Sequence, residues 1–220
     1  MTDQLVRCED LTRAFGAVTA VRDVSCAVLA GERIALTGPS GSGKSTLLHL
    51  MAGLETPTGG GVEWPVLGGH PHGRPGLVGV VFQGSSLLPA LDVTENVALP
   101  LLFAGVPASE ATARAVEALE RLRIADMGSK LPEELSGGQA QRVAVARVLA
   151  ARPPLILADE PTGQLDHEAG GLVISVLIEA ADELGAALVI STHDGAVADR
   201  LNQRWTMLDG RLTTENGSSR

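Results

Sequence analysis

The chain has 220 residues, of which 45% are hydrophobic and only 2% aromatic, which allows one large or two small α/β domains with aliphatic packing. A formal net charge of −9 argues against a nucleic-acid partner, because binding to phosphates needs a basic patch. The two cysteines, Cys8 and Cys26, are too few for a disulfide framework and favour a reducing compartment. The sequence has no signal-peptide pattern and no apolar run of about 18 residues, so we expect that the chain itself does not cross a membrane.

The N-terminal part of the sequence predicts strands followed by a helix. Residues 5–30 mix apolar and polar side chains, with turn signals at residues 16 and 31, which indicates short antiparallel strands. Residues 33–37, Arg-Ile-Ala-Leu-Thr, predict a buried strand. Residues 46–54 carry apolar residues at a helical spacing and predict a helix with Gly53 near its end.

A complete P-loop, G-x-x-x-x-G-K-[ST], lies between this strand and this helix. Its glycines allow a tight turn whose backbone N–H groups point at phosphates, and the helix begins where its dipole favours an anion. Lys44 offers a point charge to the β- and γ-phosphates, and the hydroxyl of Ser45 is a ligand for Mg²⁺. We therefore expect the chain to bind ATP and Mg²⁺, with nucleotide contacts from Gly38, Pro39, Ser40, Gly41, Ser42, Gly43, Lys44, Ser45 and Thr46.

The middle of the chain changes from turns to helices. Residues 56–76 are rich in proline and glycine and predict turns around one short strand near residues 62–66. Residues 78–82 predict a buried strand, which Gln83 follows. From residue 84 to residue 151 the spacing is helical, and we expect an α-helical insertion between strands of the main sheet. Two i,i+4 ion pairs support one of its helices: Glu110 with Arg114, and Glu117 with Arg121.

A second candidate anion site lies at Ser136-Gly137-Gly138-Gln139. Ser136 is a good N-cap for a helix that continues through residues 141–151, and the two glycines expose backbone N–H groups at its start. Because the chain has one P-loop but two such phosphate-binding turns, the second turn is expected to serve a nucleotide held by another copy.

Polar residues follow each of the strong strands. The P-loop follows the first, Gln83 the second, Asp159 and Glu160 end the apolar run of residues 155–160, and His193 follows the strand at residues 187–192. The carboxyl ends of parallel strands open on one edge of a sheet, so these groups are expected to converge. Asp159 is then a candidate Mg²⁺ ligand beside Ser45, and Glu160 is the candidate base for the attacking water. His193 is expected to contact the γ-phosphate or to support that base.

In this order and spacing, the motifs resemble those of the ATP-binding subunit of an ABC transporter over nearly the whole chain. The matching motifs are Walker A (38–45), the Q-loop (Gln83), the LSGGQ signature (135–139), Walker B (155–160), the D-loop (Leu165-Asp166) and the H-loop (His193). The resemblance implies an α/β fold with a P-loop NTPase core, a mostly parallel sheet, an N-terminal antiparallel β-subdomain and an inserted α-helical subdomain. We expect one such domain over residues 1–220, with its helical part near residues 84–151 and a frayed tail at 215–220.

The resemblance also implies partners and roles. Two copies would sandwich two ATP molecules, each held by Walker A of one copy and the signature of the other, with Asp166 nearby. Gln83 would act in catalysis and at the metal, and Phe15 would stack on adenine where the family usually has tyrosine. The chain would drive an integral membrane permease subunit and lie in the cytoplasm, on the inner face of the membrane. The apolar stretch at residues 87–91 predicts that the segment 84–130 meets that subunit.

The subfamily and the direction of transport stay open at this point. The sequences at residues 87–89, 94–97, 99–101 and 157–163 look like those of the macrolide-exporter, lipoprotein-release and cell-division group. The segment between Gly61 and Gln83 is shorter than in that group and resembles some importers, and Gln164 is unusual in a D-loop. One alternative is an ATPase that regulates a membrane partner without transport. Another is a soluble ABC ATPase that acts on DNA, ribosomes or iron–sulfur assembly, which an acidic chain with one motif set does not favour.

Overall fold

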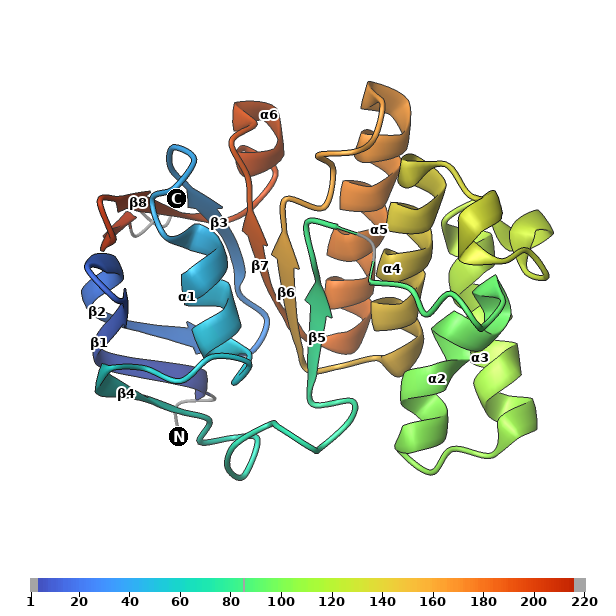
Figure 1. The fold of residues 1–220 in the computed structure, drawn as a ribbon, viewed down its shortest axis with the longest axis horizontal. Coiled ribbons are helices and arrows are strands. Elements are labelled where there is room, and N and C mark those ends of the chain that lie inside the picture. The colour runs from blue at the N-terminus through green and yellow to red at the C-terminus, as the bar shows by residue number, and fades with distance from the viewer. Residues whose placement is uncertain (1–3, 85, 216–220) are drawn as a thin grey trace.

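The computed structural model describes residues 4–84 and 86–215, in which two β-sheets and two groups of helices form the fold (Figure 1). The smaller sheet is antiparallel and has the strand order β2-β1-β4. The larger sheet has the order β5-β6-β7-β3-β8-β9, in which the first five strands are parallel and β9 is antiparallel to β8. This architecture confirms the α/β fold class expected for the family.

The chain begins with three consecutive strands, and strands alternate with helices from β6 to β8. The strands are β1 (Gln4–Phe15), β2 (Val18–Leu29), β3 (Arg33–Thr37), β4 (Gly59–Glu63), β5 (Val78–Val81), β6 (Leu155–Asp159), β7 (Ala187–Ser191), β8 (Gln203–Leu208) and β9 (Arg211–Glu215). The helices are α1 (Lys44–Met51), α2 (Val93–Phe103), α3 (Ala108–Arg121), α4 (Gly137–Ala151), α5 (His167–Leu184) and the single turn α6 (Gly195–Ala198), with 3₁₀ turns at Ala125–Met127 and Pro132–Glu134.

Two expectations about the smaller sheet are wrong. The strands β1 and β2 are 12 residues long rather than short. Asp10 and Asp23 have positive φ angles of 47° and 48° beside shifts of register, so bulges interrupt the alternating pattern while the pairing continues. The third strand is β4 at Gly59–Glu63 rather than at residues 62–66. A Cβ on Gly60 would lie 2.3 Å from backbone oxygens of β1, so glycine permits this close pairing.

The ion pairs around α3 also differ from the expectation. Glu110 and Arg114 pair as predicted, at 2.5 Å. Arg121 instead binds Glu183 of α5 at 2.9 Å, and Glu117 binds Arg152, just after α4, at 3.1 Å. This flank of α3 faces other helices, so its charges find partners that are distant in sequence. Glu215 belongs to β9 rather than to a tail, and the rest of the expected tail, residues 216–220, lies outside the described residues.

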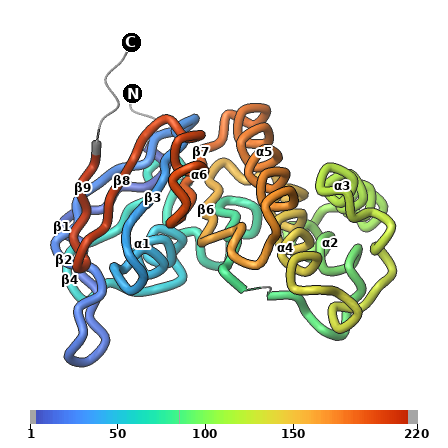
Figure 2. The backbone as a smooth tube through the Cα atoms, turned by 90° about the horizontal axis from the view of Figure 1, so that it is seen from above, coloured from blue at the N-terminus to red at the C-terminus, as the bar shows by residue number. Residues whose placement is uncertain are grey.

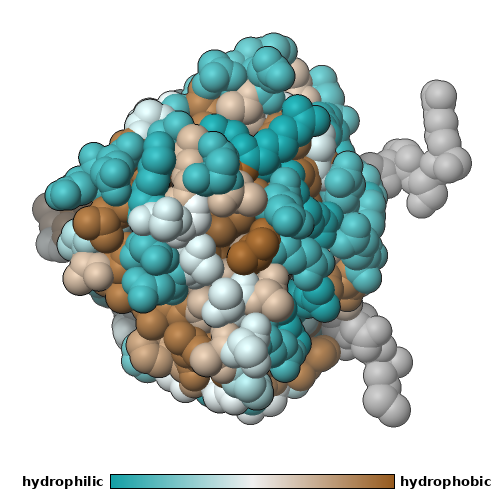
Figure 3. All heavy atoms as spheres, turned by 90° about the vertical axis from the view of Figure 1, so that its right-hand side faces the viewer, coloured by the Kyte–Doolittle hydropathy of each residue, from teal (hydrophilic) through white to brown (hydrophobic). Residues whose placement is uncertain are grey.

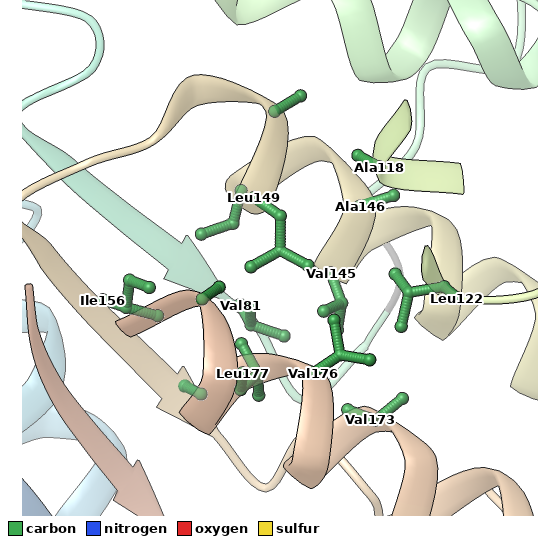
Figure 4. Packing of buried hydrophobic residues seen from close by; sticks show 14 of the residues in the cluster. Val81, Ala118, Leu122, Val145, Ala146, Leu149, Ile156, Val173, Val176 and Leu177 are labelled. Carbon is green, nitrogen blue, oxygen red and sulfur yellow. The ribbon is translucent and has the colours of Figure 1, made fainter. Parts of the chain in front are cut away.

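The larger sheet is covered on both faces, and its central strands show this in their sequences. All five residues of β6 are buried. Because side chains alternate across a strand, Ile156 and Ala158 pack into one hydrophobic cluster with α4 and α5, while Leu155 and Leu157 pack into a second cluster with α1 and the smaller sheet. Figure 4 shows the first cluster, in which Val145 and other side chains of α4 meet those of α5.

The order of the layers places α2 and α3 at one end of the molecule, while α4, the last helix of residues 84–151, lies beside α5 (Figure 2). The smaller sheet lies at one end of the molecule, α2 and α3 lie at the other, and α4 and α5 lie between them (Figure 2). The carboxyl ends of β3, β5, β6 and β7 therefore open on one shared edge of the larger sheet. Within the described residues, no helix is both long and apolar enough to span a membrane.

Candidate functional site

The P-loop connects β3 to α1 in a conformation that needs glycine at two positions. Gly38 and Gly43 have φ angles of 141° and 104°, which side-chain-bearing residues rarely adopt. A Cβ added to Gly38 would lie 2.1 Å from the backbone oxygen of Met207, and one on Gly43 would lie 2.1 Å from that of Ala20. The loop is therefore packed between β2 and β8, which fixes the direction of its backbone N–H groups.

The lysine of the loop is held by the loop itself. Lys44 is buried, with an exposed fraction of 6%. Its Nζ donates hydrogen bonds to the carbonyls of Gly38 at 2.9 Å and Pro39 at 3.0 Å. An ammonium has three donors, so two bonds hold the charge in place and a third proton is left for an anion.

Eight of the predicted site residues meet in one cavity. Its volume is about 190 Å³, and it lies at the carboxyl edge of the larger sheet. Gln83 enters it from the segment after β5, and Glu160 from the turn after β6. The loop before α1 and the first turn of that helix supply the other side. The residues that line the cavity are Ala20, Ser40, Gly41, Gly43, Lys44, Ser45, Thr46, Gln83 and Glu160.

Asp159 and Glu160 are held by a residue that sequence reasoning missed. Ser191 is completely buried and lies directly opposite Asp159 in the pairing of β6 with β7. Its hydroxyl donates to Oδ1 of Asp159 at 2.5 Å and accepts the backbone N–H of Glu160 at 3.0 Å. Glu160 has a φ of 43°, a strained value for a residue other than glycine, and this anchor helps to maintain it. In the sequence, Ser191 is the one hydroxyl-bearing residue of the otherwise apolar strand β7, and this pattern could have indicated its role.

His193 lies beside the candidate base. Its Nδ1 is 3.3 Å from Oε2 of Glu160, although the imidazole is otherwise 72% exposed. The side chain of Glu160 is 20% exposed. The contact joins the ends of β6 and β7, and it fits the expectation that His193 supports the carboxylate.

The residues at and next to the cavity offer oxygen ligands that fit a magnesium ion. Ser45 and Gln83 line the cavity and offer a hydroxyl and an amide oxygen. The buried carboxylate of Asp159, at the end of β6, does not line the cavity but directly precedes Glu160, which does. These are the oxygen ligands that Mg²⁺ prefers, and so few protein ligands leave room for water and phosphate oxygens. Because Ser191 binds Oδ1 of Asp159, the orientation of this carboxylate is set before any ion arrives.

The second candidate anion site, the turn at Ser136–Gln139, starts α4 and lies outside this cavity. Ser136 caps α4: its hydroxyl accepts the N–H of Gln139 at 3.2 Å, and the Gln139 side chain accepts the N–H of Ser136 at 2.8 Å. A Cβ on Gly137 would lie 3.0 Å from Oε1 of Gln164, and one on Gly138 would lie 3.1 Å from the Leu165 side chain. The turn therefore packs against the D-loop of its own chain.

Asp166 and Phe15 lie outside the P-loop cavity as well. Asp166 caps α5 by accepting the N–H of Ala169 at 2.8 Å, and it borders two other cavities of about 450 and 470 Å³. Phe15 ends β1 with 48% of its surface exposed. The guanidinium of Arg13 lies 4.4 Å from the centre of its ring, so one face of the ring is already covered.

Comparison with known proteins agrees with this geometry. A family model for ABC transporters matches residues 21–163. A lipoprotein-releasing system ATP-binding protein, LolD of Idiomarina loihiensis, is 39% identical and covers 99% of this chain and 100% of its own. The chain belongs to the ABC transporter family. A spermidine/putrescine import ATP-binding protein, PotA of Pseudomonas aeruginosa, is 42% identical over 96% of this chain, which spans only 59% of that relative.

Solved structures of ABC cassettes superpose over nearly the whole chain. The ATP-binding cassette MJ0796, solved as a dimer bound to ADP and Pi, has a TM-score of 0.89 and 34% identity, with 98% of this chain and 100% of that one covered. CbiO1 of Clostridium perfringens, part of the transporter complex cbiONQ, has a TM-score of 0.82 and 28% identity, with 98% and 89% covered. This ABC cassette is therefore an ATP hydrolase of a transporter-type system.

Proposed function

We propose that this ABC cassette hydrolyses ATP as a dimer in which two copies enclose two nucleotides, and that it drives a separate membrane subunit. One observation carries the proposal: the P-loop cavity and the turn at Ser136–Gln139 are both built for phosphate, yet they occupy different places on one chain. A second copy would bring its own turn to this cavity. The dimeric MJ0796 cassette bound to ADP and Pi supports the arrangement.

In the proposed site, the P-loop binds the triphosphate and the helix α1 orients it. The backbone N–H groups of the loop and the Nζ of Lys44 bind phosphate oxygens. Ser45, Asp159 and Gln83 would hold Mg²⁺, which neutralises charge on the phosphates when bound. Phe15 stacks with its open ring face on adenine, and Arg13 on the opposite face keeps the ring in position.

Hydrolysis then needs a base, and the chain supplies one beside the phosphates. Glu160 orients a water molecule and accepts its proton, since its carboxylate lines the cavity that Lys44 and Ser45 also line. His193, 3.3 Å from that carboxylate, holds it toward the cavity. Gln83 lines the same cavity and lies in the segment that leads to α2. A change in the bound nucleotide would therefore move Gln83 and, through this segment, the helical part of the chain.

The face formed by α2 and α3 is the proposed contact with the membrane subunit. A shallow groove of about 180 Å³ there is lined by Leu91, Ala98, Leu99 and Leu102, with polar residues at its edges. Exposed Leu88 and Phe103, at 45% and 71%, extend this apolar surface. Figure 3 shows apolar areas among hydrophilic ones on this side of the molecule. Such surfaces on otherwise polar faces are typical of protein contacts.

Short sequence segments guide the choice of system. The sequences at residues 87–89, 94–97, 99–101 and 157–163 look like those of the group that includes lipoprotein release, and a lipoprotein-releasing relative is 39% identical to this chain. We therefore propose that the cassette belongs to that group and lies on the inner face of the membrane through its permease.

A cross-linking experiment tests the membrane contact. A photoreactive residue at position 88, in cells, should capture an integral membrane protein, while the same residue at position 208 should not. Leu88 and Leu208 are comparably exposed, at 45% and 59%, but Leu208 lies in the β8–β9 hairpin at the other end of the molecule. Capture from position 208 alone would contradict the proposed face. Capture from neither position would contradict the proposal that a membrane subunit binds the cassette there.

A further inference from the structure

The segment that carries Gln83 is held to α4 at two points. Before Gln83, the Nε2 of Gln141 donates to the backbone carbonyl of Phe82 at 3.0 Å. After it, the guanidinium of Arg147 donates to the carbonyl of Ser86 at 2.8 Å and to its hydroxyl at 2.5 Å. These partners are 59 and 61 positions apart in sequence, so the contacts belong to the tertiary fold. Figure 1 shows the chain running from β5 toward α4 before it enters α2.

The contact of Gln141 is sheltered from water, whereas that of Arg147 with the exposed Ser86 is open to it. Gln141 is completely buried, and no other side-chain donor within the described residues reaches the Phe82 carbonyl. Arg147 is half-buried, and its desolvation lowers the pKa of the guanidinium from its ordinary value. A buried donor that loses its partner has no water to replace it, so the bond of Gln141 is not easily exchanged. The two-pronged contact of Arg147 with Ser86 also fixes direction, which a lysine would not do.

The same contacts connect the two phosphate-binding turns. Gln141 lies in the second turn of α4, two residues after Gln139, and Arg147 lies about 9 Å farther along the helix axis. The ring of Phe82 lies 5.7 Å from the ring of His49 on α1, the helix that starts at the P-loop. Phe82 therefore contacts α1 through its ring and α4 through its carbonyl, immediately before Gln83.

We propose that Gln141 and Arg147 are positioning residues that make Gln83 follow the movements of α4. When α4 shifts so that Ser136–Gln139 can meet the nucleotide of the other copy, the two contacts carry Gln83 with it, relative to Glu160 across the cavity. Two attachment points resist rotation of the segment as well as its displacement. The inference rests on the proposed role of Gln83 and does not require the membrane subunit.

Steady-state kinetics of ATP hydrolysis test this first. Gln141→Met keeps the length of the side chain but removes its donor, and Arg147→Met removes both bonds to Ser86. Each should lower kcat about tenfold and leave KM for ATP within about twofold, because the P-loop itself is unchanged. The double variant should fall by less than the product of the single effects, since both bonds hold one segment. Arg147→Lys keeps the charge and should recover only part of the loss.

Matched controls separate positioning from general loss of structure. Gln203→Met also removes one amide bond, to Glu32 at 2.7 Å, and Arg121→Met removes the pair with Glu183, yet neither contacts the Gln83 segment. Both controls should keep kcat within about twofold of the parent. If Gln141→Met does not fold, Arg147→Met and Arg147→Lys still decide the question, because Arg147 is only half-buried.

A second readout follows the segment directly. Gly84 is exposed, and a Cβ there would meet no atom within 4 Å, so a nitroxide on Gly84→Cys fits without disturbing its neighbours. In a chain whose Cys8 and Cys26 are replaced by alanine, the nitroxide should become more mobile with Gln141→Met and not with Gln203→Met. Unchanged mobility and unchanged kcat in both α4 variants overturn the inference. If Gln83→Ala itself hydrolyses ATP at the parent rate, the proposed role of Gln83 is wrong instead.

Discussion

At the scale of single residues, the nucleotide site depends on a lysine whose position the backbone fixes. Lys44→Ala removes the charge that we propose faces the β- and γ-phosphates, and it also frees the carbonyls of Gly38 and Pro39. We expect most ATP affinity and essentially all turnover to be lost, as measured by equilibrium binding of a fluorescent ATP analogue and by phosphate release. Lys130→Ala, which changes the only other lysine, should leave both unchanged. Equal hydrolysis by Lys44→Ala and the parent would exclude this P-loop as the site.

Substitution of a P-loop glycine should lower the unfolding free energy of the protein even without nucleotide. Gly43→Ala would place a Cβ 2.1 Å from the Ala20 oxygen at a φ of 104°, so the variant should lose about 1–3 kcal/mol or more of unfolding free energy without nucleotide. Gly171→Ala is the control: it lies in α5 with no atom within 4 Å of its Cβ, and helix propensity should stabilise it by about 0.5–1 kcal/mol. Denaturant unfolding of the two variants measures the change in unfolding free energy, which should be a loss for Gly43→Ala and a gain for Gly171→Ala. Equal stabilities would show that the loop is not held between β2 and β8.

At the scale of elements, one buried asparagine organises the start of the helical part. Asn96 of α2 is completely buried; its side chain accepts the N–H of Leu88, and its two amide protons are shared among the carbonyls of Leu88, Leu91 and Asp92. Asn96→Ala removes the partner of the Leu88 N–H and of the Leu91 carbonyl, while the other two carbonyls keep backbone partners, and it should cost about 1–3 kcal/mol. Hydrogen exchange should rise at residues 88–92, while the exposed Asn202→Ala changes nothing there. A protected loop in Asn96→Ala would mean that packing, rather than Asn96, orders it.

Sequence reasoning located the elements of the site better than those that surround it. The strands β3, β6 and β7 are apolar because both of their faces are buried, so their patterns were plain, and polar residues at their ends marked the edge where ligands bind. Bulges, and strands whose backbones pack closely together, are harder to recognise in a sequence. Strand β4 consists largely of glycine, which allows its close approach to β1 but ordinarily predicts a turn. Ser191, Gln141 and Arg147 also escaped notice, because their roles depend on residues 31 to 61 positions away.

At the scale of the whole molecule, the proposed dimer separates binding from hydrolysis. Glu160→Gln keeps the shape of the side chain but cannot accept a proton, so turnover should fall by about 10²–10⁴. Lys44, Ser45 and Asp159 are unchanged, and the backbone anchor of residue 160 on Ser191 does not involve the carboxylate, so ATP should still bind. Because the nucleotide then persists, the turn at Ser136–Gln139 of each copy can stay on the phosphates of the other.

Light scattering with saturating ATP and Mg²⁺ should therefore report a dimer for Glu160→Gln and a monomer without nucleotide. Adding Ser136→Arg should abolish the dimer, because the large side chain would fill the turn that must receive the phosphate, while ATP binding to each monomer remains. A matched control, Glu179→Arg, changes an exposed residue of α5 outside both phosphate-binding turns and should leave the dimer intact. A Glu160→Gln protein that turns over ATP normally would remove Glu160 from catalysis. A Glu160→Gln protein that binds ATP, hydrolyses it slowly and stays monomeric would count against the sandwich dimer for the isolated chain. Repeating the measurement with the captured membrane subunit would then show whether the dimer forms only when that partner is bound.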